Sequence, residues 1–160
     1  MQDSSVIKQQ LEQIIDGGYQ FLPEVLLAIL LVVVLIIDLI IYKRAEPKTY
    51  GFITLIGLAL VTVFGLPSFS GSISIGDFVK LIILFTGMLT TFLTVFNNQA
   101  KKTGEYYVVI IGLMIGAMLL VNATNLLLIY LSIEMLSISA YVLTGFSFSR
   151  QANEAALKYL

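Results

Sequence analysis

The stretch FLPEVLLAILLVVVLIIDLIIY, residues 21–42, decides the fold class of this chain. It is almost pure leucine, isoleucine and valine, and the charged, proline-containing cluster KRAEPK follows it at residues 43–48. A helix rises about 1.5 Å per residue, so about 20 mostly apolar residues cross the hydrocarbon core of a bilayer. The stretch therefore predicts a membrane-spanning helix that ends at the charged cluster.

The composition of the whole chain points the same way. Of its 160 residues, 58% are hydrophobic and only 12% are charged, and the mean hydropathy is +0.96. A soluble domain averages about 25% charged residues, so this composition excludes a water-soluble globule and a disordered chain. The formal net charge of −1 leaves no basic excess for binding nucleic acid. Because the sequence contains no cysteine and no histidine, we expect neither a metal site nor an electron-carrying cofactor on this chain.

Cutting the sequence at its charged and turn-rich segments predicts an all-α polytopic membrane protein. We expect an extramembrane or interfacial segment at 1–20 and a transmembrane domain over 21–160. A period-two alternation at 68–76 predicts a short surface hairpin or strand. The last helix stops after two turns, with Asn153 as its N-cap, so we expect the N-terminal part of a longer protein. The predicted helices, five complete and one truncated, are 21–42, 50–66, 77–96, 105–121, 124–146 and 153–160.

Basic residues are unevenly distributed over the predicted connections. The two connections at 67–76 and 122–125 contain no lysine or arginine. Cytoplasmic loops carry an excess of such residues, so we predict that the N-terminus lies on the external side of the membrane. The connections after the first, third and fifth spans contain Lys43, Arg44, Lys48, Lys101, Lys102 and Arg150.

Glu134 is the most informative residue because it lies near the middle of the predicted span 124–146. An ionised carboxylate at the centre of a bilayer costs at least about 2.5 kcal/mol, so it needs a proton, a partner or water. Tyr130, Ser137 and Tyr141 fall on the same helical face and form a polar stripe able to relay protons to the carboxylate. The alternative interpretation is a glutamate kept protonated or hydrogen-bonded for packing alone.

Lys158 is a second candidate, for a proton relay. It lies five residues after Asn153, about 7–8 Å into its helix, whereas Glu134 lies about 18 Å from the same surface. This predicted difference in depth, about 10 Å, argues against a direct ion pair and leaves a water-bridged connection. The alternative interpretation is a lysine that extends its ammonium group to the membrane interface.

Other charges near the spans are expected to have structural roles. Glu24 falls in the first turn of its helix, where a carboxylate complements the helix dipole. Lys80 and Asp77 are three residues apart, which predicts an ion pair at the outer end of their helix. Asp38 is assigned to an interfacial charge cluster with Lys43 and Arg44. None of these residues is predicted to belong to a functional site.

The stretch LLVNATNLLLIYLSIEMLSISAYVLTGFSFSRQANEAALKYL, residues 119–160, resembles the antiporter-like membrane subunits of respiratory complex I, most closely subunit N, called subunit 2 in mitochondria and chloroplasts. The short Asn-containing turn, the glutamate in IEMLSISAYVL and the element EAALKY carry the resemblance. It implies the N-terminal third of a subunit of about fourteen helices built from two inverted repeats. It also implies that Glu134 is the glutamate of the first proton half-channel and that Lys158 matches the lysine of EAALKY.

From this resemblance we expect a membrane-arm subunit of a proton-translocating NADH:quinone oxidoreductase. Its expected partners are the other membrane subunits of complex I, the lipid bilayer, protons and water, with flavin, iron–sulfur clusters and quinone on partner subunits. The expected location is a bacterial plasma membrane or, as the alternative, the inner membrane of an organelle. Two other functions stay open: the D-type subunit of a multi-subunit cation/proton antiporter, and a membrane scaffold that conducts nothing.

Overall fold

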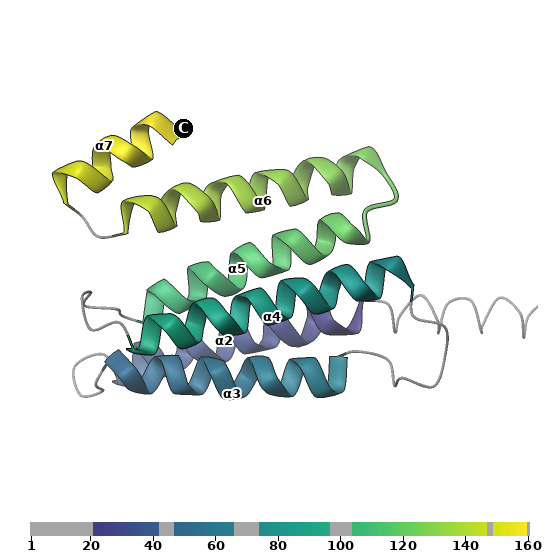
Figure 1. The fold of residues 1–160 in the computed structure, drawn as a ribbon, viewed down its shortest axis with the longest axis horizontal. Coiled ribbons are helices and arrows are strands. Elements are labelled where there is room, and N and C mark those ends of the chain that lie inside the picture. The colour runs from purple at the N-terminus through teal and green to yellow at the C-terminus, as the bar shows by residue number, and fades with distance from the viewer. Residues whose placement is uncertain (1–20, 42–46, 66–73, 97–103, 147–148, 160) are drawn as a thin grey trace, which may run out of the picture.

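The computed structural model describes residues 21–41, 47–65, 74–96, 104–146 and 149–159, and within these ranges it contains helices and turns but no strand. Four helices, α2, α4, α5 and α6, are long and apolar enough to cross a bilayer. This confirms the expected all-α polytopic membrane fold. The helices are α2 (Leu22–Ile41), α3 (Pro47–Gly65), α4 (Ile75–Phe96), α5 (Gly104–Val121), α6 (Leu126–Gly145) and α7 (Arg150–Tyr159) (Figure 1).

Helix α3 differs from the other predicted spans in length. Its apolar segment, Thr49–Gly65, falls just short of the length of a full span, so the described residues hold four candidate spans where the sequence predicted five complete ones. Helix α3 nevertheless lies against both α2 and α4. Thr54 and Leu58 on this helix are completely buried. Packing therefore makes α3 a full member of the bundle.

The helices run alternately in opposite directions, and α5 lies at the centre of their contacts (Figure 1). Helix α5 packs against α2, α3, α4 and α6. Helix α6 lies at the edge, against α5 on one side and α7 on another. Only Ser132 and Ser139 of α6 are buried, whereas half of α5 is. The architecture is thus a four-helix bundle, α2 to α5, with α6 and α7 laid along one side.

The core of the bundle forms around one face of α5. Tyr107, Ile111, Met114 and Met118 recur at helical spacing on this face and are almost fully buried. Met114 packs directly on Gly87 of α4, where an added Cβ would collide with the methionine side chain. Between apolar helices in lipid, packing depends on such close approach at small residues. Gly87 therefore lets α4 and α5 pack tightly.

Helix α4 starts earlier than the sequence predicted. It begins at Ile75, inside the segment 68–76 that we expected to form a hairpin or strand. The cause is a reciprocal cap: the Oγ of Ser74 accepts from the Gly76 N–H at 3.3 Å, and Asp77 Oδ2 accepts from the Ser74 N–H at 3.2 Å. The hairpin prediction is therefore wrong for the last residues of that segment. The rest of it, and the predicted interfacial segment 1–20, lie outside the described residues.

Helix α7 also starts earlier, at Arg150. The Oγ of Ser149 accepts from the Ala152 N–H at 3.1 Å, which caps the helix. The Asn153 N–H donates to the Ser149 carbonyl at 2.9 Å, as a residue inside the first turn does. The prediction that Asn153 is the N-cap is therefore wrong, because a serine at the preceding turn provides the cap instead.

Candidate functional site

Helix α6, which carries Glu134, begins at a well-formed cap. Asn125 has an extended backbone, with φ −133° and ψ 157°, and its Oδ1 accepts from the Leu128 N–H at 2.8 Å. The short turn before it returns the chain antiparallel to α5, as the sequence predicted. Glu134 lies eight residues after Leu126, about 12 Å along the helix. It is therefore close to the middle of a 20-residue span.

Two glycines of α5 determine which face of α6 packs inward. A Cβ added at Gly112 would lie 3.4 Å from Ser139 Oγ, and one at Gly116 would lie 3.1 Å from the backbone nitrogen of Leu136. Ser132 is buried, and its hydroxyl donates to the Leu128 carbonyl at 2.6 Å within the same helix. Small residues on α5 thus bring the backbone of α6 close along the face of Ser132 and Ser139.

The predicted polar stripe lies on the other side of α6. At 3.6 residues per turn, Tyr130, Glu134, Ser137 and Tyr141 lie about 140–200° around the helix from Ser132. Tyr130 is 60% exposed, and the other three side chains of the stripe are half-buried. The structure thus brings the four predicted residues to one face, and this face points away from α5.

Glu134 has no hydrogen bond or ion pair with any residue that the structure describes. Lys158 is exposed in the last turn of α7 and, within the same described ranges, forms no ion pair with Glu134. Because α7 starts at Arg150, Lys158 lies eight residues, about 12 Å, from the start of its helix, further along it than the sequence predicted. Helices α6 and α7 touch at Gly145, the last residue of α6, where an added Cβ would lie 3.3 Å from the Cβ of Ala156 in α7.

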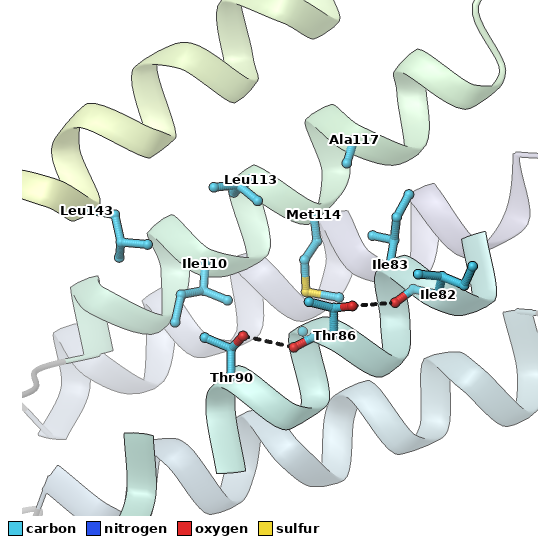
Figure 2. A pocket seen from close by; sticks show the side chains of 10 residues that line it. Ile82, Ile83, Thr86, Thr90, Ile110, Leu113, Met114, Ala117 and Leu143 are labelled. Atoms are coloured by element: carbon cyan, nitrogen blue, oxygen red, sulfur yellow. Dashed lines mark hydrogen bonds between the residues drawn. The ribbon is translucent and has the colours of Figure 1, made fainter. Parts of the chain in front are cut away.

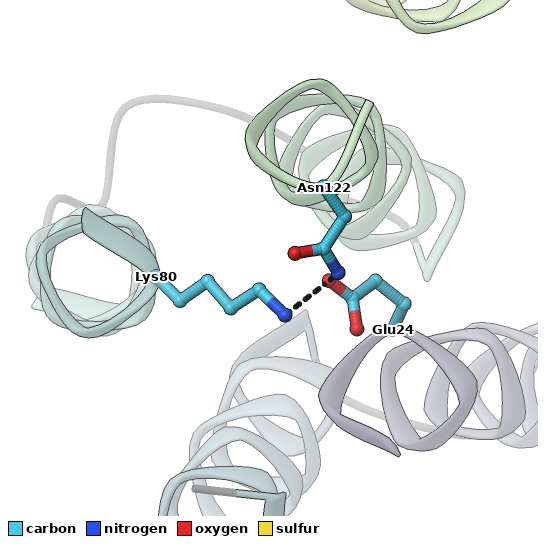
Figure 3. A network of polar contacts seen from close by, with 3 residues as sticks. All are labelled: Glu24, Lys80 and Asn122. Carbon is cyan, nitrogen blue, oxygen red and sulfur yellow. Dashed lines mark hydrogen bonds and ion pairs between the residues drawn. The ribbon is translucent and has the colours of Figure 1, made fainter. Parts of the chain in front are cut away.

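A second polar cluster, which the sequence did not predict as a unit, lies at the end of the bundle where α2 and α4 begin and α5 ends (Figure 3). Lys80 Nζ lies 2.9 Å from Glu24 Oε1, and the two side chains are only 2% and 5% exposed. The Asn122 side-chain amide donates to the same oxygen at 2.8 Å. Three helices thus contribute to one buried network.

This network extends one prediction and corrects another. Glu24 lies in the first turn of α2, as the sequence predicted, and is in addition a buried partner of Lys80 and Asn122. Lys80 does not pair with Asp77 at the interface, because Asp77 is engaged in the cap of α4 and Lys80 extends into the bundle. The ion pair with Glu24 gives the buried Lys80 ammonium group a partner. Without it, the charge of Lys80 would be buried unpaired among apolar helices, which is unfavourable.

A further contact joins α2 and α5 at the opposite end of the bundle. Asp38 Oδ1 accepts from the Gly104 N–H, the first residue of α5, at 3.2 Å, and the Tyr50 side chain also hydrogen-bonds to this carboxylate. A Cβ at Gly104 would collide with the Asp38 carboxyl group. Asp38 therefore caps α5. Its predicted basic partners at 43–46 lie outside the described residues.

An apolar groove of about 320 Å³ runs between α4 and α5 and is flanked by α6 (Figure 2). Its two hydroxyl groups donate within α4, from Thr86 to the Ile82 carbonyl and from Thr90 to the Thr86 carbonyl, each at 2.8 Å. No residue of the polar stripe or of the Glu24 cluster lines this groove. It is therefore separate from both polar sites and suits apolar contact only.

Comparison with known proteins gives a consistent group of relatives, although no family model matches the chain. The chain is 34% identical over 152 residues to NAD(P)H-quinone oxidoreductase subunit 2 of Gloeobacter violaceus, covering 86% of this chain and 29% of that protein. It is 36% identical over 138 residues to NADH-quinone oxidoreductase subunit N of Chloroflexus aggregans, covering 78% of this chain and 28% of that protein. It is 29% identical over 153 residues to NADH-quinone oxidoreductase subunit N 1 of Solibacter usitatus, covering 88% of this chain and 31% of that protein. The chain thus spans about three-tenths of the length of these curated relatives.

Proposed function

This chain is a homologue of NADH-quinone oxidoreductase subunit N, and on that premise we propose that it serves in the membrane arm of a proton-translocating NADH:quinone oxidoreductase. The resemblance of residues 119–160 to antiporter-like subunits supports the same assignment. All three relatives carry the oxidoreductase name, which favours this function over a cation/proton antiporter. The chain acts there by conducting protons, as a multi-pass protein in a bacterial plasma membrane, with its N-terminus external.

Glu134 is the residue that carries this proposal. It sits half-buried near the middle of a spanning helix, on a face that none of the described helices satisfies with a hydrogen bond or ion pair. A carboxylate at that depth costs at least about 2.5 kcal/mol unless it is protonated, paired or hydrated. A carboxyl group that meets a proton, a cation or water at that depth can pass a proton on, which is the chemistry of a half-channel.

The hydroxyl groups beside Glu134 give the proton a route along the helix. Ser137 and Tyr141 lie three and seven residues further on, and Tyr130 lies four residues before. Each hydroxyl both donates and accepts a hydrogen bond, so a row of them can pass a proton on. Lys158 of α7 extends the route as a relay on the side of α6 where α7 packs. Electron transfer through flavin, iron–sulfur clusters and quinone belongs to partner subunits.

The test is a Glu134→Gln variant of the assembled oxidoreductase, reconstituted in liposomes. Glutamine keeps the volume and hydrogen bonding of the side chain but cannot take or release a proton. We expect NADH oxidation and assembly to persist while the number of protons transported per NADH falls. Normal proton transport in a fully assembled variant would remove Glu134 from the mechanism and favour a purely structural glutamate.

A further inference from the structure

The two carboxylate oxygens of Glu24 have different surroundings (Figure 3). Oε1 receives both the Lys80 ammonium group at 2.9 Å and the Asn122 amide at 2.8 Å. Oε2 is buried as well, but it receives no hydrogen bond from any residue that the structure describes. A buried polar atom without a partner costs about 1–3 kcal/mol, and more when it is charged. Such an atom calls for an explanation beyond packing.

The geometry of Glu24 separates the roles of its two oxygens. Both side chains of the ion pair are almost fully enclosed, so Oε1 is held in place by Lys80 and Asn122. Oε2 points away from both partners and is left open to a further donor (Figure 3). A carboxyl group with one fixed oxygen and one open oxygen has the geometry that a proton-transfer site needs.

The position of the Glu24 cluster relates it to Glu134. Asn122 belongs to the short turn that ends at Asn125, the cap of α6. Glu134 lies nine residues after Asn125, about 13 Å further along the helix. The cluster therefore sits at the end of the bundle, near the membrane surface, while Glu134 sits in the interior of the same membrane half.

We propose that Glu24 is a second protonatable site of this chain, taking up and releasing a proton on Oε2 at the end of the bundle where α5 turns into α6. In the uptake step a hydronium ion gives a proton to Oε2: one of its O–H bonds breaks, an O–H bond forms on Oε2 and a water molecule is left, while Oε1 stays bound to Lys80 and Asn122. In the release step the O–H bond on Oε2 breaks and the proton passes to a water molecule, which becomes a hydronium ion. The inference rests on the proposed function, because it assigns a further residue to the same proton transport.

Few other charged groups surround this site in the described part of the chain. Helix α4 contributes Lys80 and, one turn earlier, Asp77, which accepts from the Ser74 N–H. The end of α5 contributes the neutral Asn122, and the end of α3 contributes Gly65, which packs on Pro23. Among the described residues, Lys80 is therefore the charged group that contacts Glu24.

The proposal is tested in the assembled oxidoreductase with the double substitution Glu24→Gln/Lys80→Gln. This variant removes both charges together and retains hydrogen-bonding amides, so it avoids the uncompensated charge that either single substitution leaves. We expect it to assemble better than either single variant, yet to lose coupled proton transport to an extent comparable with Glu134→Gln. An assembled double variant with a normal ratio of protons transported to NADH oxidised would overturn the proposal and leave a structural ion pair.

The Glu134→Gln variant, measured in parallel, separates the two proposals. If Glu134→Gln transports normally, the proposed function fails. If Glu134→Gln is impaired and the double variant is normal, only the Glu24 site fails.

A second measurement does not depend on assembly of the double variant. Infrared difference spectra of the wild-type complex, recorded across pH, should contain a protonated-carboxyl C=O band that shifts in Glu24→Asp. Aspartate keeps the carboxyl group but has one methylene group fewer, which changes the surroundings of the C=O bond. The frequency of the band should therefore shift while the band itself remains. A spectrum that is unchanged in Glu24→Asp would overturn the proposal.

Discussion

The ammonium nitrogen of Lys80 lies 2.9 Å from Oε1 of Glu24, and both side chains are almost fully enclosed by the bundle. Glu24 lies in the first turn of α2 and Lys80 in the second turn of α4, so their contact depends on how α2 and α4 pack. Because both charged side chains are almost fully enclosed, each one depends on the other. A single substitution in this pair should therefore lower the stability of the whole bundle.

Lys80→Met should destabilise the protein strongly. The substitution leaves Glu24 buried without its cation, and breaking a buried pair from one side costs roughly 3–5 kcal/mol. We expect a lower thermal unfolding temperature of the purified subunit and a lower assembled yield. Arg150→Met is the matched control, because the Arg150–Glu154 pair is 94% and 58% exposed and should contribute almost nothing. Equal losses in both variants would contradict a special role for the buried pair.

Gly104→Ala should also be destabilising, for steric reasons. The added methyl group would collide with the Asp38 carboxyl group and push the first turn of α5 away from its cap. Overpacking of this kind costs about 1–3 kcal/mol. Gly76→Ala is the comparison, because a Cβ there meets its nearest atom at an ordinary 3.6 Å. Unfolding by heat or denaturant should separate the two variants, and a tolerated Gly104→Ala would show that the Asp38 contact is dispensable.

The two faces of α6 should respond differently in proton transport. Ser137→Ala combined with Tyr141→Phe removes two hydroxyl groups from the polar stripe, so we expect slower proton transport at unchanged assembly. Ser132→Ala removes a hydroxyl that only bonds the Leu128 carbonyl on the face toward α5, so transport should stay normal. Both variants are measured in proteoliposomes. Impairment by Ser132→Ala alone would mean that the transport path lies between α5 and α6.

Membrane orientation can be checked with single cysteines, since the chain has none of its own. Thr124 and Ser149 are exposed and flank the opposite ends of α6. We expect a membrane-impermeant thiol reagent to label Thr124→Cys from the external side and Ser149→Cys only from the cytoplasmic side. The reverse pattern would invert the predicted topology.

Local signals in the sequence were enough to predict most of the fold. Runs of apolar residues gave the spans, and the Asn-rich turn gave the antiparallel pairing of α5 with α6. The polar stripe of α6 also followed from helical spacing alone. Helix starts were less predictable, because Ser74 and Ser149 compete with nearby residues of equal capping propensity and side-chain geometry decides between them.

The Glu24 cluster could not be found from spacing. Asn122 and Glu24 are 98 positions apart in sequence, and nothing local distinguishes a carboxylate that complements a dipole from one that reaches into a bundle. The available signal was Lys80, a lysine within the apolar helix Ile75–Phe96. A cation in that setting needs an anion on a neighbouring helix, and Glu24 is the acid at the matching end of α2.

Helices α2 and α5 are joined by polar contacts at both ends, Asn122 to Glu24 at one and Gly104 to Asp38 at the other. A slide of α5 by one helical turn, about 5.4 Å, would break both contacts at once. Helices α2 and α5 are therefore expected to move together as one rigid unit. Helix α6 is joined to α5 through the turn before it and the close approach at Gly112 and Gly116. Under the proposed function, a movement that changes access to Glu134 is therefore expected in α6, while α2 and α5 keep their relative position.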